Sequence, residues 1–87
     1  MSLTESRVRE SVVAVIADEL DIPPDKIRGD ASIREDLGAN FVEVISLTMT
    51  IENRYRVHLQ EEAGREPYTV NSIVHTLMER SDQSGAH

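Results

Sequence analysis

The first apolar stripe of the chain predicts an N-terminal helix. Apolar residues recur at steps of four, three, one and four, which is the spacing of one helix face: Val8, Val12, Val15, Ile16 and Leu20. Ser2 and Glu5 have the spacing of a capping box at its start, and Thr4 is a competing cap. We place this helix at residues 4–20.

Residues 21–39 have the composition of a long loop. Pro23 and Pro24 end the first helix, because proline disfavours the helical conformation in the residue before it. Isolated apolar residues lie between the turn-forming ones, and we expect their side chains to hold the loop against a core: Ile22, Ile27, Ile33 and Leu37. A loop of this length in a small domain is uncommon and often functional.

The segment after this loop predicts a second helix at Phe41–Tyr55, with Asn40 as its cap. Apolar pairs four residues apart support the helix: Leu47 with Ile51, Ile51 with Tyr55, and Ile45 with Met49. Many residues of this segment are β-branched, so its intrinsic helix propensity is mediocre and a strand is the alternative. The four-residue spacing and the cap favour the helix. We expect the Met49 side chain to lie in the core, together with that of Met78.

Two further segments complete the pattern. Gln60–Ala63 predicts one short helical turn ended by Gly64. Thr69 caps a last helix, whose apolar residues follow at steps of three, one, three and one: Val70, Ile73, Val74, Leu77 and Met78. The sequence thus predicts an all-α four-helix bundle over residues 1–80, with three main helices and one short one. We expect the polar residues 81–87 to form a flexible C-terminal tail.

Composition and charge narrow the functions of this 87-residue chain. A formal net charge of −7 disfavours nucleic acid as a partner and favours contact with basic protein surfaces. A domain of this size holds one core and no large substrate pocket, so we expect neither an enzyme nor catalytic residues. Cysteine is absent, and His58, His75 and His87 lack a metal-ligand spacing, so we expect no metal site. Without a secretory signal or a long apolar run, we expect a cytoplasmic monomer that does not contact membranes.

The junction between the long loop and the second helix resembles the acyl carrier protein family. Residues 36–43 read Asp-Leu-Gly-Ala-Asn-Phe-Val-Glu, where carriers typically read Asp-Leu-Gly-Ala-Asp-Ser-Leu-Asp. Weaker similarities extend over residues 7–79, among them segments 51–55, 57–59 and 68–70. The resemblance implies the four-helix carrier fold and a role in fatty acid or polyketide biosynthesis. It also implies biosynthetic enzymes as partners, such as a ketosynthase or an acyltransferase.

The resemblance fails at the residue that carries the family's chemistry. In carriers, a serine at the head of the second helix is esterified through phosphate to phosphopantetheine, whose thiol holds the acyl group. Phe41 stands at this position, and a phenyl ring has no oxygen to form the ester. We therefore expect no phosphopantetheine cofactor and a partner-binding or regulatory role without an attached acyl group. The alternative is a genuine carrier modified at another hydroxyl such as Ser46, which lies about 140° around the helix from Phe41.

The predicted partner-binding residues lie at the same helix head: Asn40, Phe41, Val42, Glu43 and Val44. Carriers of the family have a markedly acidic second helix, whereas this one has two glutamates and one arginine. We expect Phe41, Val42 and Val44 to be exposed and to form an apolar contact. Two readings of Phe41 stay open: its ring folds over Leu37 and covers the core, or it projects into a partner as an anchor.

Overall fold

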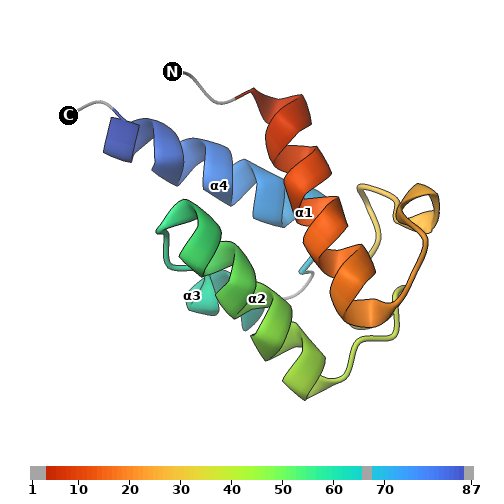
Figure 1. Cartoon of the computed structure of the whole chain (residues 1–87). Helices are drawn as coiled ribbons and strands as arrows, with labels where there is room; N and C mark the ends of the chain where they lie inside the picture. Colours follow the sequence, from red (N-terminus) through yellow and green to blue (C-terminus); the bar gives the residue numbers. More distant parts are fainter. Residues whose placement is uncertain (1–3, 66–67, 86–87) are drawn as a thin grey trace.

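The computed structural model describes residues 4–65 and 68–85, which fold into helices joined by loops (Figure 1). The elements follow in the order α1 (Glu5–Leu20), the 3-10 turn η1 (Pro24–Lys26), α2 (Phe41–Tyr55), α3 (Gln60–Ala63) and α4 (Val70–Gly85). Those two segments contain no strand, and the only β-type pairing in them is an isolated bridge between Ser32 and Thr69. The predicted all-α fold is confirmed, and α2 and α3 have the predicted bounds.

Polar side chains at the helix starts bind backbone N–H groups that lack a partner within the helix. At α1, Thr4 Oγ1 accepts a hydrogen bond from the Arg7 N–H at 3.4 Å, so Thr4 is the cap. Ser2, the competing cap, lies outside the described residues. At α2, the Asn40 side chain and the N–H of Glu43 are joined at 2.8 Å, while Glu43 Oε1 accepts from the Asn40 N–H at 2.9 Å. This reciprocal capping box lets a β-branched segment begin as a helix.

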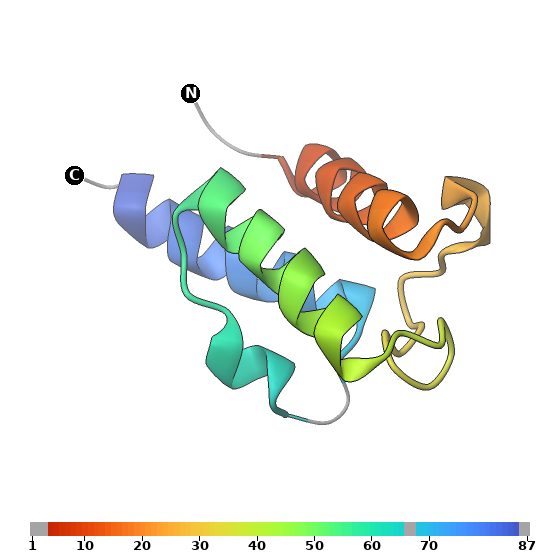
Figure 2. The same cartoon turned by 60° about the horizontal axis from the view of Figure 1, so that its bottom comes forward.

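The core forms where α1 packs against both α2 and α4, while α3 packs against α2 (Figures 1 and 2). The apolar stripes predicted for the first and last helices face this core, together with one face of α2. Its fully buried side chains include Val8, Val12, Ile16, Leu47, Ile51, Ile73 and Leu77. Burial of a side chain of this size contributes about 1.5–3 kcal/mol to folding, so these contacts dominate the stability of the fold.

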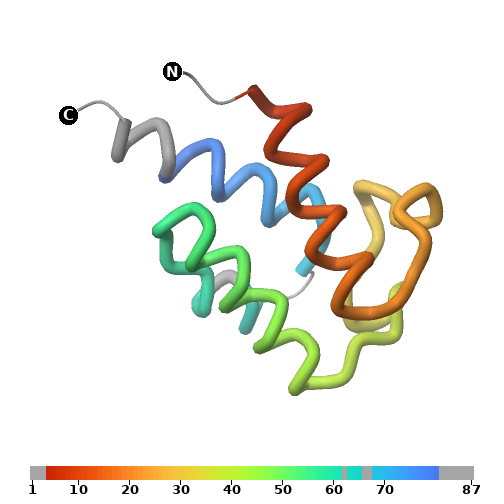
Figure 3. Tube along the Cα trace, viewed as in Figure 1, coloured from red at the N-terminus to blue at the C-terminus, as the bar shows by residue number. Residues whose placement is uncertain are grey.

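The long loop lies beside the C-terminal end of α1 and is fixed to the start of α4 (Figure 3). Its side chains Ile27 and Ile33 are buried, so this part of the loop packs against the core as predicted. Two backbone hydrogen bonds reinforce the packing: the Ile33 N–H donates to Tyr68 O at 2.9 Å, and the Asn71 N–H donates to Gly29 O at 2.8 Å. The loop therefore holds the head of α2 in a defined place.

Two predictions about side chains need correction. Met49, predicted in the core, is 50% exposed, because it lies on a face of α2 that no other described element covers completely. Val44, predicted to be exposed, is only 4% exposed. Val44 shares a helix face with Leu47 and Ile51 at steps of three and four, so it points into the core.

The C-terminal helix is longer than the sequence pattern suggested. α4 continues to Gly85, into the segment for which a flexible tail is predicted, and Ala86 and His87 lie outside the described residues. The flexibility of residues 81–87 stays a prediction. Within the described segments, no helix combines the length and apolar character needed to cross a bilayer.

Candidate functional site

The head of α2 presents two apolar side chains to solvent. Phe41, the first residue of α2, is 66% exposed, and Val42 is 71% exposed. The reading in which the Phe41 ring covers the core is therefore wrong. The ring projects from the helix, and its role as an anchor in a partner stays a prediction. Val42 lies about 160° around the helix from the buried Val44, which explains why it faces away from the core. Asn40 and Glu43 are used by the capping box, so they hold the helix head in place.

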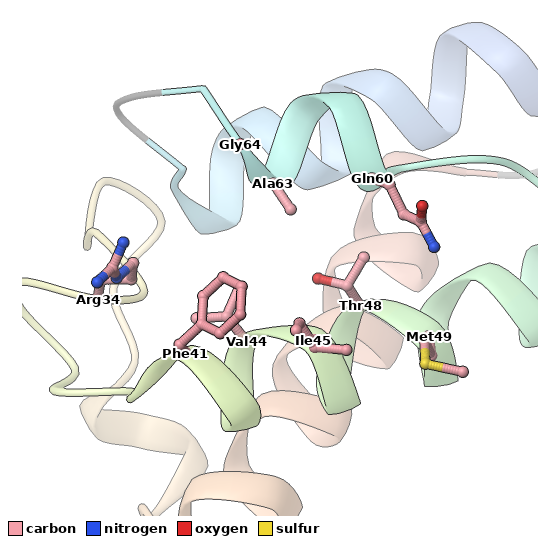
Figure 4. Close-up of a pocket in the computed structure, with 9 residues that line it drawn as sticks. All are labelled: Arg34, Phe41, Val44, Ile45, Thr48, Met49, Gln60, Ala63 and Gly64. Carbon is pink, nitrogen blue, oxygen red and sulfur yellow. The ribbon is translucent and has the colours of Figure 1, made fainter.

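An apolar ridge continues from Phe41 along α2. Ile45 and Met49 follow at steps of four and are 43% and 50% exposed. Figure 4 shows these three side chains on the α2 side of a groove, with Ala63, Gly64 and Gln60 on the other side. The groove has a volume of about 470 Å³, and Val44 and Thr48 contribute to its lining.

A buried hydrogen bond holds one of the residues that line the groove, Thr48, in place. Thr48 Oγ1 and the Tyr68 hydroxyl lie 2.9 Å apart, and both residues are almost completely buried. The bond joins the middle of α2 to the residue that precedes Thr69 and α4. Because a buried hydroxyl without a partner is costly, this pair fixes α2 against the segment that leads into α4.

Charge is sparse around the groove. Arg34, on the long loop, is the one charged residue among those that line it. Within the described part of the chain, no hydrogen bond or ion pair is recorded for its guanidinium. The two glutamates of α2 accept hydrogen bonds from backbone N–H groups: Glu43 from Asn40, and Glu52 from Leu59 at 2.7 Å. The exposed ridge of α2 is thus apolar, with a cation near its N-terminal end.

Ser46, the alternative attachment residue, faces a different neighbour. Its hydroxyl donates to Glu19 Oε1 at 3.0 Å, and both side chains are partly buried. Ser46 therefore lies on the side of α2 that packs against α1, away from the groove. The other hydroxyls of α2 are also bonded, because Thr50 Oγ1 donates to Ser46 O at 3.1 Å and Thr48 contacts Tyr68.

The histidines that the sequence analysis considered do not converge. His58 and His75 are exposed, and His75 Nε2 lies 3.6 Å from a carboxylate oxygen of Glu79. His87 lies outside the described residues. The described residues contain no group of three or more His, Cys, Asp and Glu side chains arranged to hold a metal ion.

Comparison with known proteins places this architecture in a family. The chain matches no family profile. It is 32% identical over 78 residues to an acyl carrier protein of Petrotoga mobilis, which covers 90% of this chain and 92% of that protein. The chain belongs to the acyl carrier protein family. An acyl carrier protein of Thermosynechococcus vestitus is 31% identical over 72 residues, covering 83% of this chain and 89% of its own length. One from Chlamydia trachomatis serovar D is 28% identical over 75 residues, covering 86% and 97%.

Family membership confirms the resemblance inferred from residues 36–43 and agrees with the helical fold. These relatives are named as carriers and not as enzymes. The groove was not predicted from the sequence. The four-residue step from Ile45 to Met49 was used as evidence for a helix, with Met49 placed in the core, and Arg34 and the α3 residues carry no local sequence signal for a shared site.

Proposed function

We propose that this chain is an acyl carrier protein family member that binds partner proteins without carrying phosphopantetheine. One observation carries the proposal: an exposed phenyl ring, that of Phe41, occupies the first position of α2. In the family's motif this position is the serine whose hydroxyl oxygen forms the phosphoester. The residues at this helix head do not fit the group, since neither Phe41 nor Val42 offers an oxygen.

The intact surroundings of Phe41 support a specific change of function in place of a general loss of structure. Asn40 still caps α2, and the long loop is still fixed by backbone hydrogen bonds. The change from serine to phenylalanine therefore removes an attachment point while the scaffold remains. Such a scaffold is suited to binding the enzymes of fatty acid or polyketide biosynthesis, for example a ketosynthase or an acyltransferase, as an accessory or regulatory subunit.

The contact surface in this proposal is the head of α2. Phe41 and Val42 supply exposed apolar area there, Asn40 and Glu43 hold the helix start, and Val44 supports them from the core. Large aromatic residues are frequent anchors in protein interfaces. The proposal places this chain in the cytoplasm as a monomer that works beside those enzymes.

Modification at Ser46 is less favourable on physical grounds. The Ser46 hydroxyl donates to Glu19 between α1 and α2, so attaching an arm to this oxygen removes the hydrogen bond. A modifying enzyme that approaches the head of α2 meets Phe41 first. We therefore treat modification at Ser46 as an outcome of the test below.

The test is incubation of the purified chain with coenzyme A, Mg²⁺ and a broad-specificity phosphopantetheinyl transferase, followed by intact-mass spectrometry. An acyl carrier protein with the family's serine, added to the same tube, is the internal control. We expect the control to gain one phosphopantetheine and this chain to keep its mass. A gain of the same mass by this chain contradicts the proposal, and peptide mapping then shows whether Ser46 carries the group.

A further inference from the structure

The exposed ridge of α2 has the geometry of one half of a helix–helix contact. Phe41, Ile45 and Met49 are successive members of an i, i+4 row, and the row is about 12 Å long at 1.5 Å per residue. Such rows are the ridges that fit into the grooves of another helix. Across the groove lie Ala63 and Gly64, whose small size leaves room for close approach (Figure 4). A Cβ atom added at Gly64 would meet only atoms 3.7 Å or more away.

We propose that this groove docks an α-helix of a partner protein that carries an apolar stripe and an acidic residue facing Arg34. The proposal names the partner chemistry for the function proposed above, and it rests on that function. The apolar stripe of the partner covers Phe41, Ile45 and Met49. Its carboxylate pairs with the Arg34 guanidinium, for which no ion pair is recorded in the described residues.

The charge at the groove differs in sign from the net charge of the chain. The whole chain has a net charge of −7, so nonspecific attraction favours a basic partner. Among the residues that line the groove, however, the one charged side chain is the cation Arg34. The two glutamates of α2 keep their negative charge while they accept backbone hydrogen bonds, but they are not among the lining residues. A partner that docks here is therefore selected by local charge against the overall charge of the protein.

The size of the apolar surface indicates a transient contact. From the exposed fractions of Phe41, Val42, Ile45 and Met49, the apolar patch is on the order of 400 Å². A stable interface buries about 800 Å² on each partner, so this patch alone is too small for a permanent dimer of two copies. It is large enough for the brief docking of one partner helix.

Two synthetic helical peptides test the inference. They share one apolar stripe with i, i+4 spacing and differ only in the residue at its end, which is Glu in one and Lys in the other. Binding of each labelled peptide to the full chain is measured by fluorescence anisotropy at low salt. We expect the Glu peptide to bind about fivefold more tightly than the Lys peptide, as an exposed ion pair provides. The Arg34→Glu variant should reverse this preference.

Arg28→Glu is the matched control, because it changes the net charge equally at a site away from the groove. The Arg28 side chain is 80% exposed and lies 3.4 Å from the carboxylate of Asp30. We expect Arg28→Glu to keep the preference for the Glu peptide, and Ile45→Ser to weaken both peptides. Because Ile45 is 43% exposed, that variant should remain folded, which circular dichroism verifies.

Several outcomes overturn the inference. They are a wild-type preference for the Lys peptide, absence of saturable binding by both peptides, and equal effects of Arg28→Glu and Arg34→Glu. If decanoate displaces the peptides at a concentration lower than the peptides need for binding, the groove is a site for an alkyl ligand and not for a partner helix. Self-association that excludes both peptides, seen by sedimentation, assigns it to a second copy. The intact-mass measurement of phosphopantetheine attachment to the wild-type chain does not depend on these binding results. The proposal about the missing arm and the proposal about the groove can therefore be refuted independently.

Discussion

Restoring the family's three residues at the head of α2 tests whether this motif alone decides if the chain accepts phosphopantetheine. The variant combines Asn40→Asp, Phe41→Ser and Val42→Leu. If the rest of the recognition surface is intact, it should accept phosphopantetheine from a transferase. The variant must stay folded for this test, and the exposed fractions of the altered side chains give the cost of the substitutions in stability.

The cost is small because the altered side chains lie at the surface. Phe41 is 66% exposed, so its substitution by serine removes about a third of a ring from contact, at a cost of about 2 kcal/mol at most. Val42 is 71% exposed, and its substitution should change stability by less than about 0.5 kcal/mol. Asp is as good a cap as Asn, so the capping box should survive. A loss of about 2 kcal/mol lowers the Tm of a domain of this size by about 10 °C and leaves it folded at room temperature.

The assay has two readings. Circular dichroism gives the Tm, and intact mass after incubation with coenzyme A and the transferase gives the modification. We expect one phosphopantetheine on the triple variant. The control variant carries alanine in place of serine at position 41, so it lacks only the hydroxyl oxygen and should stay unmodified. A folded but unmodified triple variant refutes the reasoning, because recognition then depends on residues outside the motif. Modification of the alanine control points to another hydroxyl.

Four substitutions, in three experiments, test the supports of the site. Tyr68→Phe leaves the buried Thr48 hydroxyl without its partner and should lower the free energy of unfolding, measured by urea denaturation, by about 1–2 kcal/mol. Adding Thr48→Val to this variant should lower it little further. If the effects of the two substitutions are strictly additive, the hydrogen bond does not couple the two residues. Asn40→Ala removes the cap of α2 and should cost about 1 kcal/mol, so an unchanged urea midpoint would count against the cap. Gly38→Ala should cost about 1 kcal/mol through backbone strain alone, since Gly38 has φ +75° and no atom within 4 Å of an added Cβ; a neutral effect on Tm would argue against that strain.

The helices were predictable because their signals are local. The stripe that begins at Val8 and the caps Asn40 and Thr69 each involve residues a few positions apart, and the structure uses them as predicted. At Thr69 the side chain accepts from the Ser72 N–H at 3.0 Å, while Ser72 Oγ accepts from the Thr69 N–H at 2.9 Å. A cap of this kind is complete within one turn of helix and an apolar stripe within one helix, so no knowledge of the tertiary arrangement is needed to recognise them.

The faces of α2 were harder to predict because the helix has apolar residues on more than one side. The pairs Leu47/Ile51 and Ile45/Met49 have the same four-residue spacing, yet the first is buried and the second is exposed. Spacing establishes that each pair shares a face, but the choice of the buried face depends on where α1 and α4 lie. Val44 lies about 60° around the helix from both the exposed Phe41 and the buried Leu47, so spacing alone did not exclude the exposure predicted for it. It is buried because it lies within about 20° of Ile51, on the side of α2 that faces the core.

Features that join distant segments were outside the reach of sequence patterns. The Thr48–Tyr68 hydrogen bond spans 20 residues, and the groove combines Arg34 from the loop with residues of α2 and α3. Neither carries a periodic signal, because each depends on how the long loop and α3 are placed against α2. The sequence therefore predicted the head of the site and missed its opposite wall.

The exposure of the residue at position 41 explains how this side chain can vary while the fold of the family persists. The side chain at the first position of α2 points to solvent, and the helix start depends on Asn40 and Glu43 instead. A hydroxyl and a phenyl ring at position 41 are therefore both compatible with the same fold. Stability places little restraint on this residue, so what stands there reflects the contacts and chemistry of the surface. For this reason the fold alone does not decide whether an arm can be attached, and the side chain at position 41 has to be considered separately from the fold.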